Sequence, residues 1–208
     1  MQSIFPVSAS APDDLFNYTK SGWYSQSMID GIDYYMTTAF FKDPSEICSS
    51  SPTEKETFIS QLYFQVGDDL LRAPMTASQA TTNLGWYKHK CFPTMGTHFL
   101  LFNPKNAATI SCDDIPPVML LYHNNVLHGW VWVQTFNFED MMPKGTNPQD
   151  QDWLKVNPWE PLRVEAMPIT FKNPPTCLIK EGGTLVNPGV NTQHVYIRDW
   201  AQIGCGGL

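Results

Sequence analysis

Four of the five histidines stand at the ends of predicted strands or inside them. His98 precedes a strand-like run, His194 lies in a similar segment, and His123 and His128 belong to one predicted hairpin. Neutral imidazoles that converge on one point are preferred ligands of zinc and copper, and an open position on such a metal polarises a bound water or substrate. We therefore take His98, His194 and His128 as candidate ligands of a zinc or copper ion. The alternative is that each imidazole is hydrogen-bonded to a backbone carbonyl or a hydroxyl group.

Catalysis without a metal needs a general acid and a general base with shifted pKa values. Glu165 is the best carboxylate for this role, because it alternates with apolar residues in a predicted strand. We expect it near His98 or His194, which makes these three the candidate catalytic residues. Arg163 shares the predicted face of Glu165, so a surface ion pair across the strand accounts for both charges more simply. The sequence leaves open whether the protein is an enzyme.

A β-hairpin is predicted around Asn124 and Asn125, because adjacent asparagines tolerate the positive φ angles of a two-residue turn. The β-rich runs 118–123 and 126–133 flank this turn. A two-residue loop sets the register of the hairpin, and this register predicts one face that is entirely apolar. The opposite predicted face carries Met119, Leu121, His123, His128, Trp130, Trp132 and Gln134.

The predicted register pairs Leu121 with His128 and Met119 with Trp130, so imidazoles and indoles share one side of the sheet. Buried imidazole and indole N–H groups need hydrogen-bond partners. This face is therefore expected to be the wall of a ligand pocket or a protein interface. Its candidate ligand-binding residues are His123, His128, Trp130 and Trp132.

The remaining pattern predicts an all-β or β-dominated α+β domain, an antiparallel barrel or sandwich with two short surface helices. The helices are predicted to begin at Ser51 and Thr76, where capping-box patterns occur. We expect residues 1–30 to form an arm packed on a single β-rich domain of residues 31–208, and the loop 137–161 to act as a lid. Further strands are predicted at 34–41, 61–66, 99–102, 162–171, 176–180 and 194–198.

Composition excludes several classes of protein. The 208 residues are 42% hydrophobic and 13% aromatic, which is enough for a packed core, whereas only 16% are charged, which is typical of extracellular proteins. The net charge is −7 and the basic residues stand singly, so a nucleic-acid partner is not expected. No apolar run is long enough to span a membrane, and residues 1–6 lack the features of a signal peptide. If the protein is secreted, its signal peptide is expected to have been removed. The sequence contains no phosphate-binding loop, dinucleotide-binding fingerprint, Gly-x-Ser-x-Gly nucleophile elbow or His-Glu-x-x-His zinc-binding helix. The common hydrolase, kinase and dehydrogenase functions therefore lack their usual sequence support.

The cysteines stand at irregular, wide spacing without a C-x-x-C pair, which favours disulfides in an oxidising compartment over a zinc ribbon. Two bridges would leave one cysteine over; Cys205, in a glycine-rich stretch, is a candidate for an interchain bond or for a tail tied back to the body. Asn17 begins an N-glycosylation sequon, Asn-Tyr-Thr, which agrees with secretion. The disulfide candidates are Cys48, Cys91, Cys112, Cys177 and Cys205.

Three segments, 91–98, 117–132 and 192–196, carry a family resemblance. They contain Met-Gly-x-His after a cysteine, Pro-x-x-Leu-Leu-Tyr with a Gly-x-x-Trp hairpin, and Thr-x-His-Val-Tyr. In these motifs the chain resembles an uncharacterised group of secreted animal proteins. The resemblance implies an extracellular domain with two recurrent histidines, His98 and His194, and it implies no particular activity.

These observations predict a secreted protein that holds a small, partly apolar ligand in a pocket of tryptophan and histidine side chains. One alternative is a metal-dependent enzyme with a histidine-based site. Another is an oligomeric extracellular structural protein, a homo-oligomer in which the Trp/His face is the subunit interface.

Overall fold

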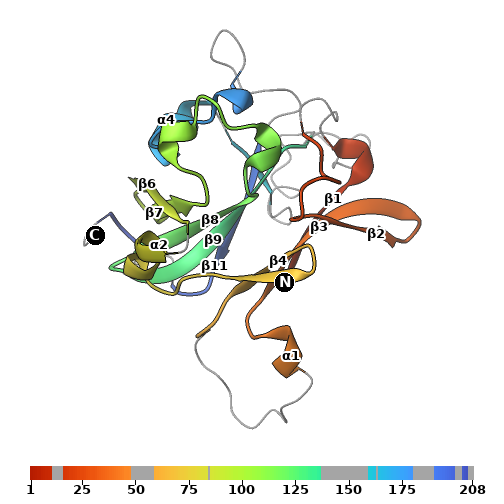
Figure 1. Ribbon diagram of the computed structural model, residues 1–208, viewed down its shortest axis with the longest axis horizontal. Helices are drawn as coiled ribbons and strands as arrows, with labels where there is room; N and C mark the ends of the chain where they lie inside the picture. Colours follow the sequence, from red (N-terminus) through yellow and green to blue (C-terminus); the bar gives the residue numbers. More distant parts are fainter. Residues whose placement is uncertain are drawn as a thin grey trace.

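The computed structural model describes residues 1–10, 16–47, 59–83, 85–136, 159–162, 164–179, 190–199 and 203–205. The described chain is mainly β, with two antiparallel sheets that pack as a sandwich rather than a closed barrel, and the predicted fold class is confirmed (Figure 1). In the parts of the chain that the structure describes, no helix is long and apolar enough to span a membrane.

The first sheet has five strands arranged around β3. Strand β1 pairs with one edge of β3, while β2 and β4 pair with the other edge, and β5 pairs with β4. Residues 1–30, which were predicted to be an arm, contribute β1 and β2 to this sheet, and the β2–β3 hairpin projects away from the rest of the molecule (Figure 1). The strands are β1 (Gln2–Pro6), β2 (Ser25–Ile29), β3 (Ile32–Phe40), β4 (Tyr63–Val66) and β5 (Asp69–Arg72).

The second sheet has six strands in the order β10-β11-β9-β8-β7-β6. The predicted hairpin β8–β9 forms its centre. The C-terminal strand β11 pairs with β9, although the two strands are far apart in the sequence. The strands are β6 (Tyr87–Phe92), β7 (Gly96–Leu100), β8 (Val118–His123), β9 (Val126–Gln134), β10 (Glu160–Pro161) and β11 (Asn191–Tyr196).

Short helices connect the strands. Helix α2 starts with the predicted capping box, because the Thr76 N–H donates to Gln79 Oε1 (3.2 Å) and the Gln79 N–H donates to Thr76 Oγ1 (3.3 Å). The helix predicted at Ser51 lies outside the described residues. The α-helices are α1 (Pro44–Ile47), α2 (Ala77–Asn83) and α4 (Met167–Thr170), and the 3₁₀ turns are η1 (Val7–Ala9), η2 (Pro104–Asn106), η3 (Cys112–Asp114), η5 (Val164–Ala166) and η6 (Thr176–Leu178).

Two predicted strands are wrong. The segment 162–171 forms η5 and α4, and the described part of 176–180 contains the turn η6. Prolines explain both cases: Pro168 stands in the first turn of α4, where its missing N–H costs nothing, and Pro175 directly precedes η6. Most of the described residues in these segments therefore form short helical turns, and extended backbone returns at Phe171 and Ile179, where α4 and η6 end.

The core between the sheets is largely aromatic. Phe64 of β4 meets Trp132 and Trp130 of β9 edge to face, with ring centroids 5.4 and 6.1 Å apart. Polar bonds also cross this interface: the Gln134 amide donates to Thr37 Oγ1 (3.1 Å), and Ser3 bonds to the Gln193 side chain. The two sheets therefore form one packed unit.

The hairpin turn forms as predicted, but the predicted register of its two strands is wrong. Asn124 and Asn125 have φ angles of 47° and 65°, as a two-residue turn of this type requires. Pairing then shifts, because Tyr122 lies opposite Leu127 whereas the preceding residue of β8 lies opposite Gly129. His128 is thus the extra residue of a β-bulge, and a one-residue insertion moves every later side chain of β9 to the other face.

Gly129 permits this bulge beside β11. A Cβ at this position would collide with the Val195 carbonyl oxygen, so a side chain cannot be accommodated where β9 and β11 approach each other. Downstream of the bulge, Trp130 and Trp132 turn toward the first sheet. Val131 and Val133 therefore alternate onto the outer face.

Two disulfides close the fold, as predicted from the cysteine pattern. Cys91 is bonded to Cys205 and Cys112 to Cys177, with Cα–Cα distances of 5.6 and 5.7 Å. Cys205 is therefore a tail cysteine tied back to the body and is not available for an interchain bond. Cys48 lies outside the described residues.

Candidate functional site

A cavity of about 200 Å³ lies over the outer face of the six-stranded sheet, beneath the segment that contains η5 and α4. Its wall is mostly apolar, with a few polar groups among the apolar side chains. The lining residues are Phe92, Met95, His98, Met119, Val131, Glu160, Pro161, Leu162, Ala166, Thr170, Thr192 and His194. Two predicted site residues, His98 and His194, therefore line the same cavity.

Strand register explains how the sheet supplies the floor and the sides of the cavity. Met119 of β8 lies opposite Val131 of β9, and Val131 lies opposite His194 of β11. His98 of β7 lies opposite Leu121, one step along the same face of β8. Strands β7 and β11 are three strand spacings apart, which is about 14 Å in a flat sheet. The two imidazoles thus enter the cavity from opposite sides, with Met119 and Val131 between them.

His98 is held in one orientation and in its neutral form. Its side chain is only 1% exposed, and its Nδ1 lies 3.2 Å from the Lys90 carbonyl oxygen. Because a carbonyl oxygen only accepts hydrogen bonds, Nδ1 carries the proton and Nε2 is left as an acceptor. Burial lowers the pKa of His98 to about 4, and the nearby imidazoles of His194 and His89 act in the same direction.

Gly96 brings His98 close to β8. Gly96 opens β7 with a φ of 88°, and a Cβ there would lie 2.5 Å from the Tyr122 carbonyl oxygen. Only glycine combines this backbone conformation with such a close approach. The Met-Gly-x-His motif therefore positions the imidazole through the glycine that stands two residues before it.

His194 forms the other side of the cavity. It is partly buried, and its ring stacks on Tyr196 with centroids 6.1 Å apart and an interplanar angle of 14°. Burial lowers the pKa of His194, and the negative charge of Glu160 partly offsets this effect. Glu160 is exposed and contributes the carboxylate of the cavity lining. The arrangement therefore has two imidazoles that are neutral at pH 7 and one carboxylate.

Sequence reasoning missed Glu160 and selected Glu165 instead. Glu165 is exposed on η5 and does not line the cavity, and Arg163 lies outside the described residues. Glu160 precedes a proline at the end of a long predicted loop, where no periodic pattern marks it. Only its pairing opposite Thr192, through β10 and β11, reveals its place.

The hairpin candidates do not form one wall. Trp130 and Trp132 are 0% exposed and lie between the sheets, because the bulge places them on the inner face. Within the described residues, neither indole N–H has a hydrogen-bond partner. Neither tryptophan lines the cavity, and His123 and His128 do not line it either. The shared Trp/His face predicted from the two-residue loop is therefore wrong.

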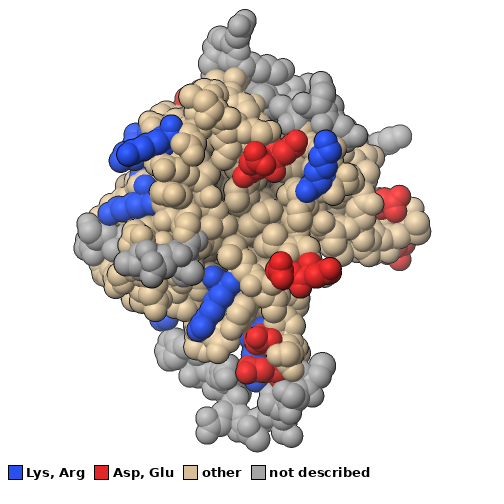
Figure 2. Space-filling view, viewed as in Figure 1, with Lys and Arg blue, Asp and Glu red and all other residues tan. Residues whose placement is uncertain are grey.

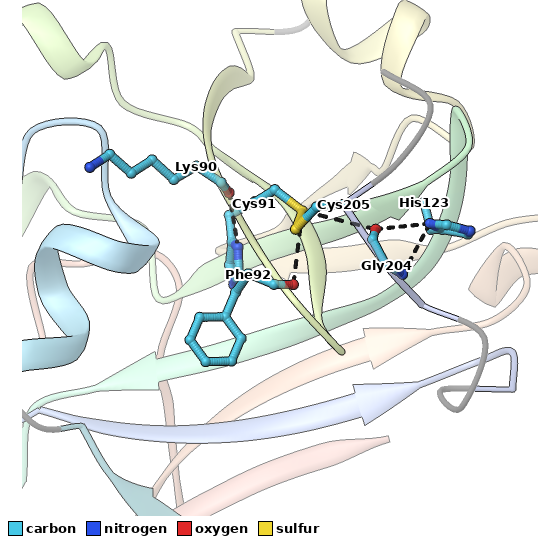
Figure 3. The surroundings of a disulfide bond; sticks show 7 residues. Lys90, Cys91, Phe92, His123, Gly204 and Cys205 are labelled. Carbon is cyan, nitrogen blue, oxygen red and sulfur yellow. Dashed lines mark hydrogen bonds between the residues drawn. A yellow bond between two sulfur atoms is a disulfide. The ribbon is translucent and has the colours of Figure 1, made fainter.

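His123 and His128 meet at the turn end of the hairpin, with ring centroids 5.4 Å apart and edge to face. His123 Nδ1 lies 2.9 Å from the Gly204 carbonyl oxygen, next to the Cys91–Cys205 disulfide (Figure 3). Burial lowers the pKa of His128, and the His123 imidazole adds to this effect. His123 therefore helps to hold the C-terminal segment against the hairpin.

Metal binding is not supported by the described side chains. Across the described ranges, no three histidine, cysteine, aspartate or glutamate side chains come together in a way that could hold a metal ion. His98, His194 and His128 are all described, and the structure does not bring them together as one site. His128 lies beside His123 at the turn end of the hairpin and does not line the cavity that His98 and His194 share, so the three imidazoles cannot each lie about 2.0–2.1 Å from one ion.

The fifth histidine, His89, was not a candidate from sequence. It is buried between Phe102 and Phe171, and its Nδ1 accepts a hydrogen bond from the Lys172 N–H (3.2 Å). Burial lowers the pKa of His89 to about 4. We interpret it as a structural histidine of the core.

Asn17, the predicted glycosylation site, is half-buried. Its Oδ1 accepts hydrogen bonds from the Thr19 hydroxyl (2.7 Å) and the Lys20 N–H (3.2 Å). Glycosylation of Asn17 stays a prediction. On the face shown in Figure 2, lysine and arginine side chains stand in small separate groups, and aspartate or glutamate side chains lie beside some of them.

Comparison of the chain with known protein families, curated protein sequences and solved structures finds no match. The resemblance to secreted animal proteins stays a prediction. The cavity between His98 and His194 is therefore the basis for a functional proposal.

Proposed function

We propose that this protein binds a small, partly apolar, uncharged ligand in the cavity between His98 and His194. One observation carries the proposal: two neutral imidazoles approach an apolar cavity from opposite sides. Enclosed apolar surface with a few convergent polar groups is the usual form of a small-molecule site. The ligand predicted from sequence is retained, while its site moves from the tryptophans to the outer face of the sheet.

The cavity limits the size of the ligand. Its volume of about 200 Å³ is below the roughly 300–1,000 Å³ of pockets that hold drug-sized molecules. Met119 and Val131 provide an apolar floor between the two imidazoles. A short molecule with a hydrogen-bonding group at each end and an apolar middle matches this geometry.

The charges of the cavity disfavour an anionic ligand. Among the described residues that line it, none is lysine or arginine, and Glu160 disfavours an anion. In this tautomer the Nε2 of His98 is an acceptor, so a ligand group that meets it is a donor such as a hydroxyl. We therefore infer that small phenols and alcohols with a second polar group are the ligand class.

We also propose that the protein acts outside the cytosol. The two disulfides support this, because such bonds persist mainly in oxidising compartments. The low fraction of charged residues supports the same location.

The experiment fills the cavity with a side chain and measures ligand binding. Ala166 lines the cavity, so Ala166→Phe is expected to occupy it and abolish binding of small phenols and alcohols detected by ligand-observed NMR. Ala108→Phe is the matched control, because Ala108 is exposed and does not line the cavity. Binding that is equal in wild type and Ala166→Phe would refute the proposal, as would a wild type that binds no member of the ligand class.

A further inference from the structure

A second hollow, of about 390 Å³, lies beside the start of β6 and shares no residue with the histidine cavity. Tyr87 is its exposed aromatic side chain, and the loop after β7 supplies Asn103, Asn106 and Thr109. Leu101 and Ile110 add apolar surface. None of the described residues that line this hollow is charged, so its ligand is expected to be neutral.

Tyr87 is the exposed aromatic residue among those that line the hollow. Tyr87 is the first residue of β6 and is 39% exposed, although most tyrosines of the fold are more deeply buried. Phe102, the other aromatic residue of the hollow, is only 3% exposed and belongs to the core. The hollow therefore offers one aromatic platform.

The polar groups can donate and accept hydrogen bonds. Asn103 Oδ1 accepts from the Lys105 N–H (2.9 Å), which leaves the Asn103 amide N–H groups to face a ligand. Asn106 is exposed. The Thr109 hydroxyl donates to the Asn106 backbone carbonyl (3.2 Å), so the hydroxyl oxygen of Thr109 can still accept a hydrogen bond from a ligand. Amides and hydroxyls beside an aromatic face match the alternating hydroxyl and C–H surfaces of a sugar ring.

The loop that carries these groups is held rigidly. The Cys112–Cys177 disulfide joins it to the segment that follows α4. From that segment, the Thr176 N–H and the Asn173 amide donate hydrogen bonds of 3.0 and 2.8 Å to carbonyl groups of the loop. A braced loop loses little conformational entropy when a ligand binds, which favours a weak, polar ligand such as a sugar.

We propose that this hollow binds a neutral hexopyranose, free or at the end of a glycan, stacked on Tyr87 and hydrogen-bonded to Asn103, Asn106 and Thr109. A proline-rich peptide fits less well, because such peptides dock in grooves lined by several exposed aromatic side chains. A nucleic acid would need basic residues, and the lining has none. This site is independent of the histidine cavity and of its ligand.

The test uses the full chain and saturation-transfer NMR with glucose, galactose, mannose and N-acetylglucosamine. At least one of these sugars should receive saturation from the wild type, and its affinity should fall about tenfold in Tyr87→Ala through loss of stacking. Tyr87→Trp should bind the sugar like the wild type, because it keeps an aromatic ring for stacking. This variant also tests the proposal if Tyr87→Ala does not fold. Thr109→Val, which replaces the hydroxyl by a methyl group of similar size, should weaken binding.

Tyr34→Ala is the matched control, because Tyr34 is a partly exposed tyrosine of the other sheet. The cavity variant Ala166→Phe should bind the sugar like the wild type, which separates this proposal from the first one. Absence of saturation for all four sugars overturns the proposal. Binding that is unchanged in both Tyr87→Ala and Thr109→Val overturns it as well, and so does a proline-rich peptide that binds at Tyr87 when the sugars do not.

Discussion

Burial of His98 makes the stability of the protein depend on pH in a predictable direction. The pKa of His98 is lowered to about 4 in the folded chain, whereas an unperturbed histidine has a pKa of about 6.5. Between these values the unfolded chain binds a proton that the folded chain does not. The contribution of His98 to stability is therefore complete above pH 6.5 and is lost as the pH falls to about 4.

The size of this effect follows from the pKa difference. A shift of about 2.5, at 1.36 kcal/mol per unit, corresponds to about 3 kcal/mol. His89 is also buried with a pKa lowered to about 4, so the wild type should lose a further contribution of the same order over the same range. Substitution of His98 alone separates the two.

The assay is urea unfolding of wild type and His98→Gln at several pH values from 7.5 to about 4. Glutamine keeps an N–H that can donate to the Lys90 carbonyl, but it does not titrate. At pH 7 the variant should be less stable than the wild type, and the difference should shrink by about 1.4 kcal/mol per unit between pH 6.5 and 4. His123→Gln, at the turn end of the hairpin, controls for loss of an imidazole outside the cavity. A constant difference between wild type and His98→Gln over this range would refute the reasoning.

Three further predictions concern stability. Gly129→Ala should lower the free energy of unfolding by about 3 kcal/mol or prevent folding, because the new Cβ would collide with the Val195 carbonyl oxygen. Thermal unfolding measures this loss. A loss below about 0.5 kcal/mol would contradict the close approach of β9 and β11. Replacing Cys112 and Cys177 by alanine should cost about 4 kcal/mol, since the bond closes a loop with a sequence separation of 65, and urea unfolding under non-reducing conditions checks the value. Thr76→Ala should cost about 1 kcal/mol through loss of the helix cap, whereas serine at this position should keep most of the stability in the same assay.

Features set by a few neighbouring residues could be predicted from sequence. The Asn124-Asn125 turn, the capping box at Thr76 and the strand content depend on local backbone preferences and on hydrogen bonds between residues near in the chain. The cysteine pattern likewise predicted disulfides, although the partners of Cys91 and Cys112 required the folded chain.

The helical turns after Leu162 show where local pattern was insufficient. β-Branched and apolar residues there resemble a strand, but Pro168 and Pro175 favour short turns, and packing against the sheet decides the outcome. The cavity depends on these turns, because the segment from η5 to α4 covers it and contributes Ala166 and Thr170.

The sequence predicted that His98 and His194 belong to one site, but it could not predict where their side chains meet. Their meeting depends on the order of strands in the sheet, which brings β7 and β11 to opposite sides of β8 and β9. The tryptophans changed faces because one extra residue, His128, shifts the alternation of β9. Side-chain alternation along a strand is local, but the insertion of a bulge is determined by the strand on the other side, where Gly129 leaves room for the Val195 backbone.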